Sequence, residues 1–479
     1  MAGKDRRGPF PRRRESRKRL LAGQPLLPHT ASTLHATPPD AAIRPFTVTH
    51  RGILAIAVPM TLAYLSTPLL GFADVAVIGR LGDAALIGGI ALGAVVFDFL
   101  GAIFYFLRSG TTGFTAQAFG AGDRVEIQAT FFRAVLIAFA GGLAVALLAR
   151  PLLPLVIAAF GASAEVSAAT LRYAEVRILA TPFMLVGYVL LGWLLGLGRS
   201  GFALVLQTVL NGLNIVLNIA FVMGLGFGVA GTAAATALSE ALVACIGLAL
   251  ILRSFARVDR PSRARVLDRA ALIRMVAVNR DIMIRSFALL FAFAFFASRG
   301  AALGDTLLAA NALLMNFFLI GAYFLDGFAA AAEQFAGRAV GARYRPAFER
   351  SVKLTLVWGY ALAFGAAALL LLCGPALIDF MTVNPDVRAA ARTYLVWAAL
   401  TPIAGVLAFE MDGVFIGATW TADMRNMMLL SLALFFAVWF IAGPILGAHG
   451  LWLALVVFLS ARGITLFLRM RGRIAATFG

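Results

Sequence analysis

Twelve long apolar stretches follow one another along the chain, and they limit its possible folds more than any other feature. Each is close to or above the roughly 20 residues that an α-helix needs to cross the ~30 Å hydrocarbon core of a bilayer. Backbone polar groups in lipid need partners within the protein, which helices of this length provide. We therefore predict an all-α integral membrane protein with twelve transmembrane helices. The stretches are 53–79, 85–107, 127–149, 169–197, 202–223, 230–252, 275–298, 307–337, 351–373, 389–417, 426–446 and 450–468.

The composition excludes several other classes of protein. Hydrophobic types make up 61% of the 479 residues and charged types 13%, which is too little polar surface for a water-soluble enzyme or a disordered chain. A GxxxxGK[ST] loop is absent, and the four histidines lie in the tail region or in a loop. We therefore expect no enzyme activity, no cofactor and no metal site. Cys245 and Cys373 lie inside apolar stretches and are expected to be buried.

The placement of the basic residues orients the chain, whose net charge is +18. Arginine and lysine gather in residues 1–50, in the loop 253–274 and in the stretch 338–353, whereas the loops 224–229 and 447–449 contain none. Short cytoplasmic loops carry the excess of Lys and Arg. We therefore expect a multi-pass protein of the bacterial inner membrane with both termini in the cytoplasm. Residues 1–50 are interpreted as a disordered basic tail on the cytoplasmic face or as an upstream start-site extension. Binding of lipid or nucleic acid by the tail is the weaker alternative, and we expect no nucleic-acid partner.

Four short patterns recur in the same order after 219 to 222 residues, which indicates an internal repeat. The pairs are Leu81-Gly82-Asp83 with Leu303-Gly304-Asp305, Ala180-Thr181-Pro182 with Leu400-Thr401-Pro402, Gly192–Gly196 with Gly413–Gly417, and Gly228–Gly231 with Gly447–Gly450. We predict two lobes of six helices each, an N-lobe over 51–252 and a C-lobe over 275–479, with 253–274 as a basic linker. Six is an even number, so the pseudo-two-fold axis runs along the membrane normal. Secondary transporters built in this way bind their substrate between the halves.

Asp74 is the leading candidate for a functional residue, because an ionisable group at bilayer depth is costly and is usually functional. Burial disfavours the charged form of a carboxylate, so such a group can bind a proton near neutral pH. Pro59 and Pro68 each remove a helical hydrogen bond, and they predict a hinge in the same helix. Protonation of Asp74 would then change which packing this helix prefers. The alternative is a structural ion pair with a cation such as Arg285.

Other polar residues inside the apolar stretches are candidates for a substrate or ion cavity. They are Asn214, Asn218, Thr236, Arg285, Asp326 and Asp412. Asn214 and Asn218 share a helix face, and they either coordinate a ligand or hold helices together by hydrogen bonds. Arg285 either faces the cavity or extends to the membrane surface. Glu410 and Asp412 are two residues apart, so we expect them to point to different sides of their helix.

Four motifs resemble a known family. Residues 68–81, PLLGFADVAVIGRL, are similar to the first helix of the multidrug and toxic compound extrusion (MATE) transporters. Residues 111–121, 279–286 and 411–419 are similar to the DinF (DNA-damage-inducible protein F) subfamily. The resemblance implies twelve helices in two lobes and cation-driven efflux of drug-like, often cationic, compounds. It also implies that Asp74 is the proton-linked residue. Asn218 stands where many relatives have an acidic residue, and this departure argues against a sodium site there.

The hypothesis is therefore antiport of a lipophilic or cationic small molecule by alternating access. The expected coupling ion is the proton, with Na⁺ as the alternative, and the expected state is a monomer in the lipid bilayer. A flippase for lipids or lipid-linked sugars is the alternative, and it predicts more cations that face the cavity. An integral-membrane enzyme that acts on lipids would need a His/Asp cluster or a carboxylate pair at one interface, and none is evident. A membrane anchor explains buried carboxylates poorly.

Overall fold

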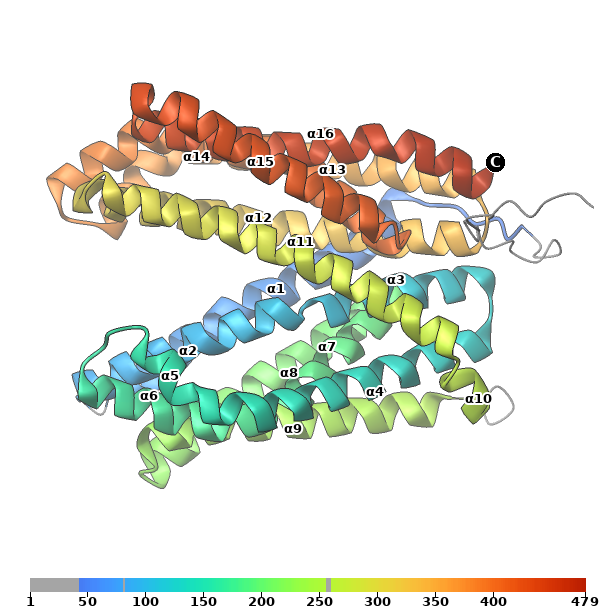
Figure 1. Cartoon of the computed structure of the whole chain (residues 1–479), viewed down its shortest axis with the longest axis horizontal. Coiled ribbons are helices and arrows are strands. Elements are labelled where there is room, and N and C mark those ends of the chain that lie inside the picture. Colours follow the sequence, from blue (N-terminus) through green and yellow to red (C-terminus); the bar gives the residue numbers. More distant parts are fainter. Residues whose placement is uncertain (1–42, 81, 256–259) are drawn as a thin grey trace, which may run out of the picture. The chain divides into compact units, whose positions relative to one another are not determined.

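The computed structural model describes residues 43–80, 82–255 and 260–479, with some side chains of the first long helix left out. The described residues are almost entirely α-helical and contain no strand, as the apolar stretches predicted. Figure 1 shows the long helices in two groups, α1 to α9 and α11 to α16. Most of the basic tail predicted over 1–50 lies outside the described residues.

The first group forms the N-lobe, and several of its spans are broken into consecutive helices. Its elements are α1 (His50–Gly79), α2 (Ala84–Phe104), α3 (Phe106–Ala121), α4 (Arg124–Ala149), η1 (Arg150–Leu152), α5 (Leu153–Ala158), α6 (Ala164–Arg177), η2 (Ile178–Ala180), α7 (Thr181–Gly196), α8 (Ser200–Asn218), η3 (Ile219–Gly224) and α9 (Gly228–Ser254). The short helix α10 (Arg263–Val266) follows. The C-lobe has unbroken helices: α11 (Arg269–Ala302), α12 (Asp305–Gly341), α13 (Arg345–Met381), α14 (Pro385–Gly417), α15 (Thr421–Leu446) and α16 (Ala448–Phe478).

Eleven helical stretches among the described residues are long and apolar enough to cross a membrane. The 30-residue helix α1 precedes them, so the twelve-span prediction is confirmed. Every predicted stretch coincides with one of these spans, apart from residue 197 at the end of the fourth, but several spans are longer than predicted. The second span covers Ala84–Ala121, because α3 continues α2 with polar residues that are buried by neighbouring helices rather than exposed to water.

Local sequence explains where many helices begin. The side chains of Thr49, Asp83, Asp123 and Asp268 each accept a hydrogen bond from a backbone N–H in the first turn of the helix that follows. Such caps satisfy amide groups that have no partner inside the helix. Helix α3 is followed by Gly122, whose φ of 64° is in the left-handed region that glycine adopts without a steric penalty.

Helix α1 is continuous through Pro59 and Pro68. Each proline lacks the N–H that would bond to the preceding turn, so the helix is weakened at two points without being interrupted. The hinge role of both residues stays a prediction.

The two lobes are joined at the end of the bundle that carries the basic loops, which we call the basic end. The Gln117 side chain of α3 donates to the backbone oxygen of Gly417 at 2.9 Å and to the Thr419 hydroxyl at 3.1 Å. Gly120 of α3 lies so close to the backbone of α12 that a Cβ atom would overlap the carbonyl of Arg338. The interface here is therefore formed by direct backbone packing.

The residues just before α1 also contact the C-lobe at the basic end. The Arg44 backbone N–H donates to the Ala342 carbonyl at 3.1 Å, and the Arg350 Nε donates to the Val48 carbonyl at 2.6 Å. The Phe46 ring lies 4.0 Å from the guanidinium of Arg338. Residues 43–49, which the sequence assigned to the tail, thus follow the surface of α12 and α13.

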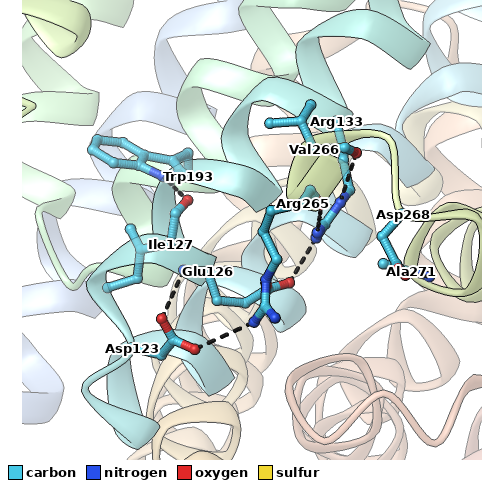
Figure 2. Close-up of polar contacts among 9 residues, drawn as sticks. All are labelled: Asp123, Glu126, Ile127, Arg133, Trp193, Arg265, Val266, Asp268 and Ala271. Atoms are coloured by element: carbon cyan, nitrogen blue, oxygen red, sulfur yellow. Dashed lines mark hydrogen bonds and ion pairs between the residues drawn. The ribbon is translucent and has the colours of Figure 1, made fainter. Parts of the chain in front are cut away.

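The linker between the lobes is fixed to α4 (Figure 2). The Arg133 side chain donates to the backbone oxygens of Arg265 at 2.6 Å and Val266 at 3.1 Å, and it pairs with Glu126 at 2.6 Å. Arg265 also pairs with Glu126 at 2.9 Å. Asp268 then caps α11. The start of the C-lobe is thereby attached to the N-lobe.

The prediction that Cys245 and Cys373 are buried is wrong, since both are exposed on their helices. A helix in a bilayer presents its outer face to lipid, so an apolar residue can lie there as favourably as in the interior.

Candidate functional site

The N-lobe encloses a cavity of about 710 Å³ at the depth of its membrane spans. Residues from α1, α2, α6, α7, α8 and α9 line it, together with Tyr323 of α12. Many of these residues are aromatic: Phe97, Tyr105, Tyr173, Phe183, Tyr188 and Tyr323. A volume of this size, with a surface that is mainly apolar and carries convergent polar groups, is typical of pockets for drug-sized molecules.

A buried ion pair forms one wall of this cavity. Arg177 of α6 donates to both carboxylate oxygens of Glu240 in α9, at 2.6 and 2.8 Å. The guanidinium also lies 5.2 Å from the centre of the Phe97 ring. The pair links α6 to α9 and neutralises its own charges. Glu240 thus pairs within its own half of the chain.

Asp98 of α2 also lines the N-lobe cavity. It makes no hydrogen bond or ion pair with a described residue, although the Arg177 charge acts on it from a longer distance. With Arg177 and Glu240 mutually paired, Asp98 gives the described lining an uncompensated negative charge.

The predicted polar stripes of the fifth and sixth spans face each other. The Asn214 Nδ2 of α8 donates to the Thr236 hydroxyl of α9 at 2.9 Å, and the Thr232 hydroxyl donates to the Asn218 Oδ1 at 3.1 Å. Asn214 and Thr236 line the cavity, and the Asn214 Oδ1 has no hydrogen-bond partner among the described residues. Asn218 is 1% exposed and does not line the cavity. The stripes therefore hold α8 against α9, and the Asn214 Oδ1 is a buried acceptor without a partner among the described residues.

A second cavity of about 270 Å³ lies between the lobes, lined mostly by C-lobe residues with Tyr64, Tyr105, Arg108 and Ser109 from the N-lobe. Asp412 of α14 lines this cavity and binds two arginines. It pairs with Arg462 of α16 at 2.6 Å and with Arg285 of α11. Two of the predicted cavity residues are therefore brought together. The alternative that Arg285 extends to the membrane surface is not what the structure shows.

An ion pair in the same region crosses between the lobes. Arg108 of α3 donates to Glu333 of α12 at 2.8 Å and to the Tyr64 hydroxyl of α1 at 2.8 Å. The two charged side chains are 6% and 2% exposed. Breaking an ion pair that is so well shielded from water is costly if either charge stays buried without its partner. It therefore favours the arrangement in which the lobes are closed at the basic end.

Asp326 of α12, the third predicted cavity residue in this region, also lines the cavity between the lobes. It makes no hydrogen bond or ion pair with a described residue, although the charges of Arg108, Arg285 and Arg462 act on it. The three arginines are balanced in number by Glu333, Asp326 and Asp412.

Of the other predicted site residues, Pro68 lines the N-lobe cavity. Asp74 belongs to α1, but its side chain lies outside the described residues, so its role stays a prediction. Among the described residues, no group of three or more His, Cys, Asp and Glu side chains is arranged to hold a metal ion.

Sequence reasoning missed three arginines at membrane depth: Arg108, Arg177 and Arg462. Arg177 and Arg462 lie inside predicted apolar stretches, so the rule that selected the acids would have selected them too. Arg108 was missed because the second span was predicted to end at residue 107. The buried run of Ser, Thr and Gly after it was the available signal that the span continues.

Two lobes of membrane-spanning helices with polar cavities at membrane depth are the architecture of a secondary transporter. Residues 59–220 and 282–441 match the MatE family. The DNA damage-inducible protein F of Escherichia coli (strain K12) is 39% identical over 428 residues, which are 88% of this chain and 92% of that protein. The chain therefore belongs to the MATE family, as its motifs predicted, and it is a transporter rather than an enzyme.

Other relatives and solved structures agree with this assignment. The multidrug resistance protein PmpM of Pseudomonas aeruginosa is 27% identical over 449 residues, covering 87% of this chain and 90% of that protein. A crystal structure of MATE in complex with MaL6 has a TM-score of 0.78 and 21% identity over 89% of this chain and 97% of that one. An outward-facing multidrug resistance MATE transporter has a TM-score of 0.76 and 21% identity over 89% and 96% of the two chains. These structures share the fold.

Proposed function

We propose that this chain exports lipophilic or cationic drug-like compounds in exchange for protons. The observation that carries the proposal is the N-lobe cavity of about 710 Å³, whose lining includes several aromatic rings and has Asp98 as an uncompensated charge among its described residues. Relatives named as multidrug resistance and multidrug export proteins support the same substrate class.

The lining favours a cation with an apolar body. A carboxylate attracts positive charge more strongly where water is sparse, and the faces of tyrosine and phenylalanine rings attract cations as well. A flat organic cation therefore gains from both the charge of Asp98 and the rings of Phe97, Tyr105 and Tyr188.

Proton coupling is proposed for Asp74, on the strength of its motif. A carboxylate that binds either the substrate or a proton, but not both well, exchanges one for the other. Each proton that moves down a potential of ~100 mV releases about 2.3 kcal/mol, nearly a fifty-fold concentration ratio of a neutral solute. Na⁺ is the alternative coupling ion.

Alternating access is supported by the unequal contacts between the lobes. The Arg108–Glu333 pair, the bonds of Gln117 and the segment 43–49 all join the lobes in their basic-end halves. By the distribution of basic loops, this end faces the cytoplasm of a bacterial inner-membrane protein. The described state is then the one closed to the cytoplasm, and export requires these contacts to separate.

The flippase alternative is less well supported. An anionic headgroup would need cations that are free to bind it. The arginines that line the two cavities, Arg108, Arg177, Arg285 and Arg462, are each ion-paired with a carboxylate of the chain.

The proposal is tested with the purified chain in proteoliposomes and ethidium, a flat aromatic cation, as the probe. An imposed proton gradient is expected to drive ethidium transport, whereas a sodium gradient alone is not. Asp98→Asn should raise the half-saturating concentration for ethidium about tenfold, because the cavity loses its uncompensated charge. This change corresponds to a loss of roughly 1.4 kcal/mol of binding free energy.

The control is an uncharged aromatic dye of similar size, whose transport Asp98→Asn should leave nearly unchanged. Ethidium transport that ignores both gradients would refute a coupled antiporter. Equal weakening for the charged and uncharged probes would refute the electrostatic role of Asp98.

A further inference from the structure

Glu410 of α14 differs from the other buried acids of the described residues. The side chains of Asp281, Glu333, Asp412 and Asp423 are each paired with at least one arginine. Glu410 is 0% exposed, and neither of its carboxyl oxygens has an ion-pair partner or a well-formed hydrogen bond. It lies outside both cavities.

The surroundings of Glu410 are apolar and tightly packed. It faces α13, where a Cβ atom on Gly359 would lie 3.1 Å from its Oε1 and 3.0 Å from a methyl group of Val406. Leu325, Ala363 and Val406 form a small buried cluster between α12, α13 and α14, with Tyr360 packed against it. A carboxyl group fits here because position 359 has no side chain.

The charged groups around this position do not neutralise a carboxylate. From α12, the charged residue that acts on Glu410 is another acid, Asp326. Arg462 of α16 is bound to Asp412, which points to the other side of α14. A carboxylate that is buried without a cation or hydrogen bonds is strongly disfavoured relative to the neutral acid.

A polar side chain also faces Glu410. This residue is Thr355 of α13. Its hydroxyl has one proton, which it donates to the backbone oxygens of Ser351 at 3.1 Å or Val352 at 3.2 Å. Toward Glu410 the hydroxyl oxygen can therefore only accept a hydrogen bond. A protonated carboxyl can donate that bond, whereas a carboxylate cannot.

We propose that Glu410 is a second proton-binding site of the transporter, located in the C-lobe and occupied when α12, α13 and α14 are packed as in this structure. Its proton leaves when these helices separate enough to admit water: the carboxyl O–H bond breaks, the proton passes to a water molecule, and a hydrated carboxylate remains. This inference rests on the proposed function, because it adds a proton site to a proton-driven cycle.

The direct test is infrared spectroscopy of the full chain in lipid nanodiscs at neutral pH. Wild type is expected to show a carboxylic-acid C=O band that Glu410→Gln lacks. Glu349→Gln is the matched control: Glu349 is exposed and paired with Arg345, so its replacement should remove no such band. An acid band of equal intensity in wild type and Glu410→Gln would overturn the proposal.

A second variant keeps the test decisive if Glu410→Gln folds poorly. Thr355→Val removes the acceptor that faces the acid, so the acid band should move to higher frequency. A band that does not move would contradict the assigned contact.

The transport readout separates this proposal from the proposed function. With ethidium in proteoliposomes, Glu410→Gln should lose one ionisation from the pH profile of the transport rate, and Glu410→Asp should restore part of it. If wild type responds to the proton gradient and the profile of Glu410→Gln is unchanged, the Glu410 role is wrong and the proposed function stands. If wild type does not respond, the proposed function is wrong, and the infrared band still decides whether Glu410 binds a proton.

Discussion

At the scale of single residues, the arginines that line the two cavities are notable because each one is paired with a carboxylate. A guanidinium cannot lose its proton under physiological conditions, so it must be paired wherever lipid or protein excludes water. Arg177 meets this need with two hydrogen bonds to Glu240, and Arg108 meets it with Glu333 and Tyr64. Among the described residues, Asp98 and Asp326 have no such partner, although both line a cavity.

The Arg177–Glu240 pair gives a prediction about stability. Glu240→Gln leaves the buried guanidinium without its carboxylate, so the free energy of unfolding should fall by about 3–5 kcal/mol. The measurement is equilibrium unfolding in detergent. Glu349→Gln, in an exposed pair with Arg345, should change the same quantity by less than about 1 kcal/mol.

A double variant checks the mechanism of that loss. Replacement of both Arg177 and Glu240 by methionine removes the unpaired charge together with the pair, so much of the lost stability should return. If Glu240→Gln unfolds like wild type, the pair does not stabilise the fold as proposed.

Sequence reasoning identified candidate residues better than their contacts. Arg285 and Asp412 were both selected, but their pairing joins α11 to α14 across 127 residues of chain, a distance that no local pattern encodes. The opposite orientation of Glu410 and Asp412 was predictable because it follows from the 100° rotation per residue of a helix. Arg462, which completes the Asp412 site, was within reach of the same rule that selected the acids.

At the scale of helices, the linker between the lobes is the clearest case of a contact that sequence patterns do not predict. The linker was predicted from its basic charge alone. Its attachment to α4 depends on Arg133, whose side chain is 3% exposed, and on the backbone carbonyls that α10 presents to it. Backbone carbonyls carry no sequence signal, so this contact could not be predicted.

The linker contact predicts a change in protease sensitivity. Arg133→Met removes the hydrogen bonds that hold α10, so trypsin should cut the arginine-rich linker at least several-fold faster in the detergent-solubilised protein. Arg172→Met is the matched control, because Arg172 bonds only within its own helix α6. Equal cleavage rates for wild type and Arg133→Met would show that the linker is held by other contacts.

At the scale of the whole molecule, the number of spans, their division into two lobes and the family were predictable from the sequence. The number of spans was predictable because each apolar stretch must be long enough to cross the bilayer. The two lobes were predictable because short sequence patterns recur at a nearly constant spacing. The conformational state was not predictable, because it depends on a small difference in free energy between two packings of the same helices. The contacts of Arg108, Gln117 and Arg44 across the basic end define the state described here.

The Arg108–Glu333 contact gives a prediction about the relative populations of the two conformational states, closed and open at the basic end. Glu333→Gln weakens the pair between the lobes, so the population should shift toward the state that is open at the basic end and closed at the opposite end. Spin labels at the exposed positions Glu165 and Val383, with Cys245 and Cys373 replaced by alanine, report this change by electron–electron distance measurement.

Shorter label distances should gain population in Glu333→Gln relative to the same labelled protein with Glu333. Glu349→Gln in the labelled background should leave the distribution unchanged. Identical distributions with and without Glu333→Gln would show that the Arg108–Glu333 pair does not hold the lobes together.

The central claim is that drug export is driven by protons through Asp74, and the most direct test measures both movements in everted membrane vesicles. A respiration-generated pH gradient is established, and ethidium is added. Wild type should release protons from the vesicles as ethidium enters them. Asp74→Asn should reduce this exchange at least tenfold, because an amide cannot bind and release the proton. If Asp74→Asn exchanges ethidium for protons as fast as wild type, the coupling role of Asp74 is contradicted.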